Sequence, residues 1–138
     1  MAVAVFDADV LIGYLEPSDP HHTAAVARVR HAVERGARRF LSAVNYAELL
    51  IAPLRASGRN GADRVDEMLA DLEIEVVPVD MSLGRIAAEV RERTNLTLVD
   101  AFPIAAAIHI GRRGHKDVGV HSFDEEVVKA YASHRSAT

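Results

Sequence analysis

Apolar and polar positions alternate along this chain in a way that predicts strands separated by helices. Short apolar runs predict strands over residues 3–6, 39–42, 75–79 and 118–121. Apolar side chains spaced by three or four residues predict helices over 21–35, 43–54, 62–73, 81–94, 100–113 and 123–134, and another short helix after the first strand. This order favours an α/β fold with a mostly parallel central sheet of four to five strands, covered by helices on both faces.

Single residues mark several of the predicted helix ends. Gly36 and Gly114 follow helices at the position where glycine accommodates a left-handed backbone. Ser42 suits the N-cap of the helix over 43–54, and the Ser-Gly and Asn-Gly pairs within 57–61 predict a loop after it. The side chains expected to face the core include Ala25, Val26, Val29 and Val33 in one helix and Val127, Val128 and Tyr131 in the last.

Composition limits the class of protein. A chain of 138 residues without repeats or a linker predicts one domain over residues 1–138. The absence of cysteine excludes disulfides and thiolate metal sites. With 49% apolar and 26% charged residues, no apolar run of membrane-spanning length and no N-terminal targeting pattern, the chain is expected to be cytoplasmic, with no membrane partner.

The net charge of −4 excludes nucleic-acid binding driven by the charge of the whole chain, which leaves local basic clusters. Lysine occurs only at Lys116 and Lys129, so nearly all cations are arginines. The clusters are Arg28 with Arg30, Arg35 with Arg38 and Arg39, and Arg112 with Arg113 and Lys116. Each of them also fits a solvated helix face, although arginine is well suited to gripping phosphate.

Carboxylates interrupt the apolar pattern where predicted strands end and helices begin. Asp7 follows the first strand, Asp9 lies two residues later, and Asp124 follows the last strand. Glu48, in NYAELLIA, and Asp100, in LTLVDAFPIAAA, lie among apolar helical neighbours. Because parallel strands end at the same edge of a sheet, Asp7 and Asp124 are expected to emerge together, at the edge where open α/β folds bind ligands.

Each acid also has a purely structural explanation, which for Asp124 is the start of a helix, where acidic residues suit the helix dipole. Asp7 or Asp9 would cap the next helix, and Glu48 would reach water from the border of an apolar face. Asp100 would be an N-cap, with Pro103 in the first turn of its helix. If these acids lie together, however, their like charges repel and persist only with a counter-ion. Ligands that are all carboxylate oxygens favour Mg²⁺ or Mn²⁺, the ions of phosphate-ester hydrolysis.

The segments VFDADVLIGYL, SAVNYAELL, LTLVDAFPIAAA and VGVHSFD resemble those of PIN-domain ribonucleases, in particular the toxin half of VapBC-type toxin–antitoxin pairs. The resemblance covers essentially the whole chain. It implies a three-layer α/β/α sandwich, dependence on Mg²⁺ or Mn²⁺, and endonucleolytic cleavage of RNA. It places the family's four acids at Asp7, Glu48, Asp100 and Asp124, and its small hydroxyl residue at Ser122. Asp7 and Asp100 would hold the principal metal ion, and Glu48 and Asp124 would complete the site.

The resemblance also implies partners: a homodimer or larger toxin–antitoxin assembly, and a small antitoxin whose tail lies across the active-site groove. An apolar excess over residues 24–33 and 43–54 is consistent with such contacts. Arg112, Arg113 and Lys116 are candidate contacts to the RNA backbone. Two residues depart from the family pattern. Asp9 stands where Asn, Ser or Thr is frequent and is a possible extra metal ligand, and Pro103 follows the third acid closely.

Two other functions remain open. A phosphatase of the haloacid-dehalogenase type would use Asp7 as nucleophile and Asp9 as acid/base, with Ser42 and Lys116 as further members of its site. That alternative leaves Glu48 and Asp100 unexplained, and the chain is short for the phosphatase fold with its cap. A PIN-like module that binds RNA or protein without cleaving it is the second alternative.

Overall fold

The computed structural model describes residues 1–137 and confirms the predicted α/β class. In chain order the elements are β1 (Ala2–Phe6), α1 (Ala8–Leu15), α2 (His22–Glu34), β2 (Arg38–Ser42), α3 (Ala43–Asp71), β3 (Ile74–Val77), α4 (Met81–Arg93), α5 (Leu98–Arg112), β4 (Asp117–His121) and α6 (Glu125–Ala137). The strands form a four-stranded sheet in the order β3-β2-β1-β4, and every neighbouring pair is parallel.

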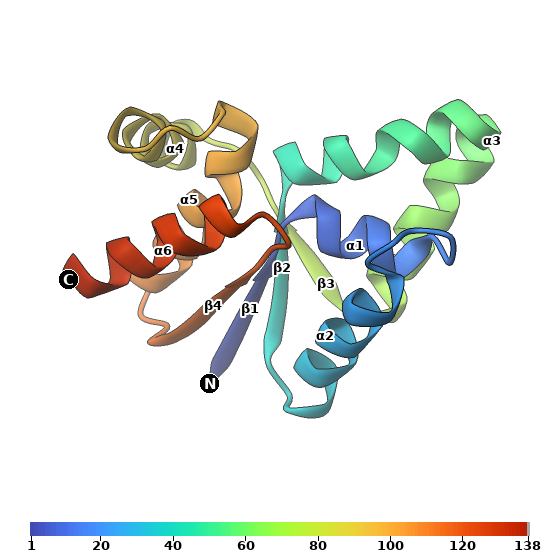
Figure 1. Ribbon diagram of the computed structural model, residues 1–138, viewed down its shortest axis with the longest axis horizontal. Coiled ribbons are helices and arrows are strands. Elements are labelled where there is room, and N and C mark those ends of the chain that lie inside the picture. The colour runs from blue at the N-terminus through green and yellow to red at the C-terminus, as the bar shows by residue number, and fades with distance from the viewer. Residues whose placement is uncertain (138) are drawn as a thin grey trace.

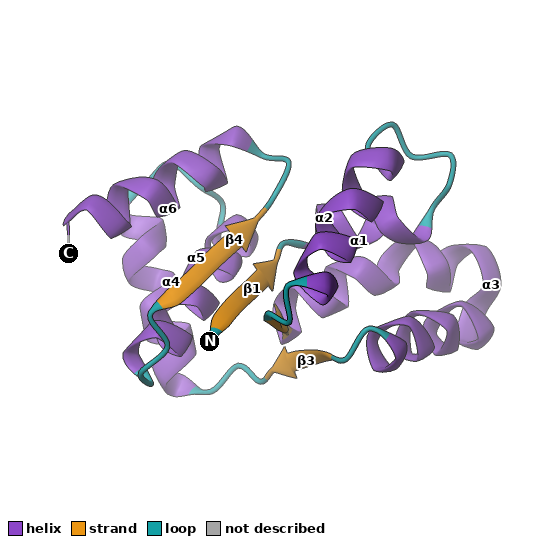
Figure 2. Cartoon of the chain, turned by 90° about the horizontal axis from the view of Figure 1, so that it is seen from below, coloured by secondary structure: helices purple, strands orange, loops and turns teal. Residues whose placement is uncertain are grey.

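Helices cover both faces of the sheet, so the fold has three layers. Figures 1 and 2 show α1, α2 and α3 on one side of the strands and α4, α5 and α6 on the other. Alternate residues of β1 divide between the two sides: Ala4 and Phe6 pack among side chains of α1–α3, whereas Val3 and Val5 pack against α5.

Within the described residues, no single helix is long and apolar enough to cross a membrane, and only α4 and α5 pass that test together, as a pair bent by 119°.

The helical stretch α3 is folded back on itself at Gly58. The backbone of Gly58 is not helical (φ 56°, ψ −139°), and the two halves are joined by a 2.6 Å hydrogen bond from the Tyr46 hydroxyl to Asp66. Gly61 lies so close to the carbonyl group of Pro53 that no side chain fits there. The predicted loop is therefore confirmed as a break, but a sharper one than expected, since residues on both sides of Gly58 remain helical.

Two predicted core positions are wrong. Val33 is 41% exposed and Val128 is 44% exposed, whereas the neighbouring Ala32 and Val127 are buried. In α2 the buried stripe is rotated by one residue from the expected one, because Ala32 contributes little to an apolar pattern but allows the closest packing. In α6 Val127 and Tyr131 of the expected stripe pack against the core, and Val128 alone of the three is exposed.

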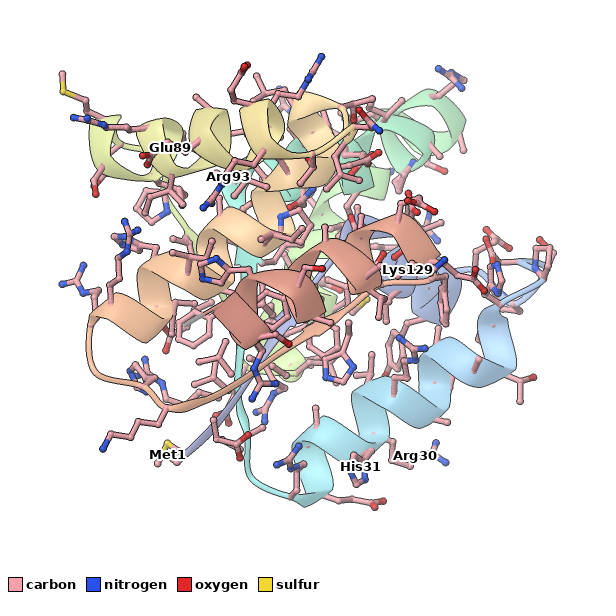
Figure 3. The ribbon with its side chains drawn as sticks, turned by 60° about the vertical axis from the view of Figure 1, so that its left-hand side comes forward. Met1, Arg30, His31, Glu89, Arg93 and Lys129 are labelled. Carbon is pink, nitrogen blue, oxygen red and sulfur yellow. The ribbon has the colours of Figure 1, made fainter. Side chains whose placement is uncertain are left out.

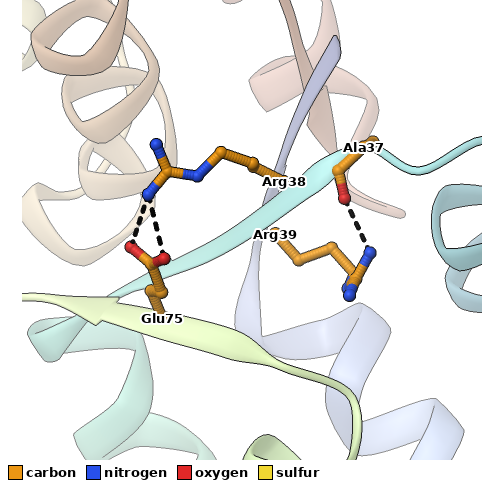
Figure 4. Close-up of polar contacts among 4 residues, drawn as sticks. All are labelled: Ala37, Arg38, Arg39 and Glu75. Atoms are coloured by element: carbon orange, nitrogen blue, oxygen red, sulfur yellow. Dashed lines mark hydrogen bonds and ion pairs between the residues drawn. The ribbon is translucent and has the colours of Figure 1, made fainter. Parts of the chain in front are cut away.

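The arginines around β2 stabilise the sheet rather than forming an open basic patch. Arg38 donates two hydrogen bonds to Glu75 on the neighbouring strand β3 (2.9 and 3.1 Å), as Figure 4 shows. Arg39 donates to the carbonyl oxygens of Leu72 and Ala37, at 2.6 and 2.7 Å. Because the carbonyl groups and Glu75 satisfy these guanidinium groups, the structural explanation fits this part of the cluster.

Candidate active site

The carboxyl ends of β1 and β4 place two of the predicted acids side by side. The two strands are paired in parallel through to Phe6 and His121, and the Asp7 N–H donates to the His121 carbonyl oxygen at 2.8 Å. The chain therefore leaves both strands at one point, with Asp7 starting α1 and the segment 122–124 leading into α6. This confirms that Asp7 and Asp124 emerge at the same edge.

Asp7 is a buried carboxylate that caps α1 and also contacts the segment after β4. Its Oδ1 accepts the Ala8 N–H at 2.8 Å and so caps α1, while its Oδ2 accepts the Ser122 hydroxyl at 2.9 Å. Burial and, after it, the nearby charge of Asp9 raise the pKa of Asp7 to about 7, although the two hydrogen bonds oppose this. Capping and a perturbed acid thus coincide in one residue.

Asp9 joins α1 to the segment after β4 instead of capping the helix. Its Oδ2 accepts the Phe123 N–H at 2.9 Å and lies 3.4 Å from the Ser122 hydroxyl. Its Oδ1 is buried and has no hydrogen-bond partner in the described part of the chain. Burial is the main cause that raises the pKa of Asp9, and the charge of Asp124 adds to it. A buried carboxylate oxygen without a donor is energetically costly unless a cation accompanies it.

The segment 122–124 is held by contacts on several sides. The Ser122 hydroxyl accepts the Asp124 N–H at 3.0 Å, and the Ser122 carbonyl oxygen accepts a bond from Arg28 at 3.1 Å. The Phe123 ring stacks on His21 with a centroid distance of 4.4 Å, and the Arg28 guanidinium lies 4.7 Å from the centroid of the same ring. The carboxylate of Asp124 accepts the Glu126 N–H at 2.9 Å, which starts α6.

Glu48 is positioned from α3 by a buried asparagine. Asn45 is fully buried, with its Oδ1 accepting the Ser42 hydroxyl at 2.6 Å and its Nδ2 lying 3.4 Å from Glu48 Oε1. The same Nδ2 lies 3.5 Å from the carbonyl oxygen of Val99 in α5. Burial raises the pKa of Glu48, and the charges of Asp100 and Asp9 raise it further. Asn45 therefore connects the helix that carries Glu48 to the helix that carries Asp100.

Asp100 is the third residue of α5 and not its cap. Thr97 begins the helix, and its hydroxyl accepts the Asp100 N–H at 3.2 Å. The expectation that Asp100 is the N-cap is wrong, because a threonine already stands at the helix start. Pro103 consequently lies in the second turn, where its missing N–H leaves the carbonyl group of Val99 without its helical partner. Asn45 lies beside that free carbonyl oxygen.

The electrostatic causes of the pKa shifts link all five acids. The charge of Asp9 acts on Asp7 and Glu48, that of Asp100 acts on Glu48, and that of Asp124 acts on Asp9. Residues from α1, α3, α5 and the start of α6 thus share one negative field at the carboxyl edge of the sheet.

A family model of the PIN domain matches residues 4–133. The chain belongs to the PIN domain family. Among solved structures, this PIN domain is similar to VapC20 of Mycobacterium tuberculosis, a toxin that cleaves the sarcin–ricin loop. The TM-score is 0.64 at 16% sequence identity, and the match covers 95% of this chain and 94% of that one. The fold is therefore shared, while none of the curated proteins matches this chain.

The acids of this PIN domain fit a divalent cation by their chemistry. All donors are carboxylate oxygens, their charges raise one another's pKa values, and Asp9 Oδ1 is buried without a partner. In residues 1–137, however, no three His, Asp or Glu side chains are arranged so that they could hold one ion together. The structure therefore shows carboxylates whose charges act on one another, but it does not show a complete set of metal ligands among the described residues.

The predicted basic cluster lies at the opposite edge of the PIN domain. Arg112 ends α5, about 18 Å along the helix from Asp100 at its start. Lys116 precedes β4, whose first residue pairs with Ala2 at the far end of β1. The structure therefore does not bring Arg112, Arg113 and Lys116 together with the acids, and their contact with RNA stays a prediction.

Several residues that organise the site were missed from the sequence. Asn45 has a detectable signal, since this polar residue, the first of NYAELL, falls at an apolar position of the helix. His21, Arg28 and Phe123 have none, because their stacking depends on the placement of α2 beside the segment after β4.

Proposed function

We propose that this PIN domain is a metal-dependent endoribonuclease that acts as a toxin and is neutralised by a small antitoxin protein. The observation that carries the proposal is that Ser122 joins Asp7, Asp9 and Asp124 at the ends of β1 and β4, where Asp9 Oδ1 is buried without a partner among the described residues. The charges of Asp9 and Asp100 also act on Glu48. Membership of the PIN domain family and a fold shared with an RNA-cleaving toxin support it.

In this proposal Asp7 and Asp100 hold the principal Mg²⁺ or Mn²⁺ ion, and Glu48 and Asp124 complete the site. Asp9 is an additional ligand candidate through its unpartnered Oδ1. When bound, a divalent ion neutralises the carboxylates and polarises a phosphodiester for attack by water.

The other residues of the site keep these acids in place. Ser122 donates to Asp7 and accepts from the Asp124 backbone, so one hydroxyl fixes two of the acids. Asn45 holds Glu48 at a set distance from α5. Positioned charges accelerate a reaction because they need no reorganisation when the transition state forms.

The proposed partners are a second copy of the chain and an antitoxin. Exposed apolar side chains on α3, Ile51 (53% exposed) and Leu54 (45% exposed), provide a surface for one of them. These two residues lie within the stretch 43–54 that the sequence indicated. By contrast, Ala25, Val29 and Ala32 of the stretch in α2 are buried in the core of the monomer.

The phosphatase alternative loses support from the structure. Ser42 is fully buried and its hydroxyl caps α3, so it does not face a substrate. Lys116 precedes β4 at the end of the sheet remote from Asp7. The second catalytic set of a phosphatase is therefore not assembled around Asp7 and Asp9. A non-catalytic RNA- or protein-binding module remains the alternative to test.

The decisive experiment is cleavage of total cellular RNA by the purified chain with Mg²⁺ or Mn²⁺. EDTA and an Asp7→Asn variant serve as controls, and phosphate release from a small ester is measured in parallel. Discrete products that disappear in both controls support the ribonuclease. Intact RNA with rapid release of phosphate would support the phosphatase, and the absence of both activities would favour a binding module.

A further inference from the structure

A groove runs from the candidate active site along α6. Its first part, of about 390 Å³, begins at Asp100 and Asp124 and lies between α6 and the segment that joins α4 to α5. Its second part, of about 300 Å³, lies between the last turn of α4 and α6. The two parts share Thr94, Ala130 and Ser133, so they form one continuous depression, which we call the α4–α6 groove.

Two cations line the α4–α6 groove beyond the acids. Lys129 lines the first part and Arg93 the second, and both side chains are exposed. Neither forms an ion pair within residues 1–137, although Glu126 also lines the first part. Figure 3 shows Arg93 on α4, one turn after Glu89, and Lys129 on α6. Arg93 and His134 of α6 line the same second part of the groove, and the charge of Arg93 contributes, after burial, to lowering the pKa of His134.

The exposed lining of the groove is polar. Asn95, Thr97 and Ser133 present amide and hydroxyl groups, whereas the apolar members Val90, Leu96 and Ile104 are buried. A protein segment that binds in a groove needs apolar anchors in pockets, which this lining does not offer. Hydroxyl, amide and cationic groups are instead the contacts that phosphates and ribose hydroxyl groups receive in RNA complexes.

We propose that the α4–α6 groove binds the RNA strand on one side of the scissile phosphate, with Lys129 and Arg93 contacting successive phosphates. From Asp124 to His134 the groove follows α6 for about 15 Å, which is room for a few nucleotides of an extended strand. The inference rests on the proposed ribonuclease function, since it needs the scissile phosphate to lie at the acids. It assigns the RNA path to this face and not to the remote cluster of Arg112, Arg113 and Lys116.

The test is the affinity for a short, fluorescein-labelled single-stranded RNA of mixed sequence, followed by anisotropy. It is carried out with Mg²⁺ in the Asp7→Asn background, in which the proposed enzyme leaves the RNA uncut. Lys129→Gln and Arg93→Gln are compared with two matched controls, Arg85→Gln and Arg91→Gln, which replace exposed arginines of α4 that do not line the groove.

Each groove variant is expected to weaken binding by about fivefold, as for one exposed ion pair. It should also reduce the slope of log affinity against log salt by about 0.7, as for one lost phosphate contact on a single strand. The control variants should bind like the parent.

If the groove variants bind RNA as tightly as the control variants, the inference is overturned. This is also the result expected if the groove receives a protein segment instead of RNA. Failure of the proposed function gives a different pattern: the wild-type chain cuts no RNA and no variant, the parent included, binds it. In that event the inference falls with the function on which it rests.

Discussion

The hydroxyl group of Ser122 donates a 2.9 Å hydrogen bond to Asp7 Oδ2 across 115 positions of the sequence. The hydroxyl oxygen of Ser122 also accepts the Asp124 N–H at 3.0 Å. One small side chain therefore fixes the first and the last acid of the site relative to each other, and it does so at the seam between β1 and β4, where it is buried.

Replacing this hydroxyl should damage both stability and activity. Ser122→Ala removes the donor to the buried Asp7 carboxylate and the acceptor of the Asp124 N–H, which is expected to cost about 1–3 kcal/mol. RNA cleavage should fall more than tenfold because Asp7 and Asp124 lose their common anchor. Urea denaturation and cleavage rates measure the two effects, with the exposed Ser82→Ala as control. A variant as active and as stable as the control would contradict the anchoring role.

The stability of the protein should depend on pH through His121. Burial, followed by the positive charges of Arg28, Arg35 and His31, lowers the pKa of His121 to about 4 from its ordinary value of 6.5. The unfolded chain therefore binds a proton at His121 at a higher pH than the folded chain does. The contribution of neutral His121 to the free energy of unfolding is complete above pH 6.5 and is lost as the pH falls toward 4. His121→Phe keeps a ring against Phe6, whose centroid lies 5.3 Å from that of His121, but cannot titrate.

The measurement is the free energy of unfolding in urea with EDTA, at several pH values between 4 and 8, for wild type and His121→Phe. The stability of the wild type relative to the variant should decrease as the pH falls through this window. A constant difference over the whole range would show that His121 is not held neutral by the fold.

Asp9 should matter more as an acceptor than as an acid. Asp9→Asn retains an oxygen for the Phe123 N–H, and we expect less than a tenfold loss of RNA cleavage. Asp9→Ala leaves that partly buried N–H without its acceptor, which is expected to cost about 1 kcal/mol and to loosen the segment that carries Asp124. Comparing the two variants by thermal unfolding and cleavage tests this. Complete inactivity of Asp9→Asn would instead point to an acid/base or an indispensable ligand.

Asn45 and Pro103 should be energetically coupled. Asn45→Ala removes the partners of Ser42, Glu48 and the Val99 carbonyl group together, and we expect a loss of roughly 2 kcal/mol. Pro103→Ala supplies the missing N–H to that carbonyl oxygen. Asn45→Ala should therefore cost less in the Pro103→Ala background, which a double-mutant cycle in urea measures. Strict additivity would mean that the 3.5 Å contact with Val99 contributes nothing.

Two glycines in helices should respond in opposite ways to alanine. At Gly61 a Cβ atom would overlap the carbonyl group of Pro53, so Gly61→Ala should force the halves of α3 apart and cost about 2–3 kcal/mol. At Gly84, in α4, a Cβ atom meets open space, and Gly84→Ala should gain about 0.5–1 kcal/mol from helix propensity. Thermal unfolding of both variants gives the comparison. A neutral Gly61→Ala would show that the hairpin of α3 adjusts freely.

The sequence by itself determined the elements and the residues at their ends. Short apolar runs located the four strands, and apolar positions spaced by three or four residues located the helices to within a few residues, apart from the predicted helices over 43–54 and 62–73, which are one bent element, α3. The acids were recognisable since charge is costly among apolar neighbours, and the glycine at 58 marked the break in α3. Membership of the PIN domain family followed from the same segments.

Only the tertiary structure decided how these parts meet. The strand order β3-β2-β1-β4, the bond from Ser122 to Asp7 and the link from Asn45 to Val99 join residues far apart in sequence, where no local period carries information. The same is true of charge: Lys129 lines a groove that begins at the acids, while the denser cluster ending at Lys116 lies at the far edge. Local patterns follow from which side chains avoid water, whereas the site follows from which surfaces pack together.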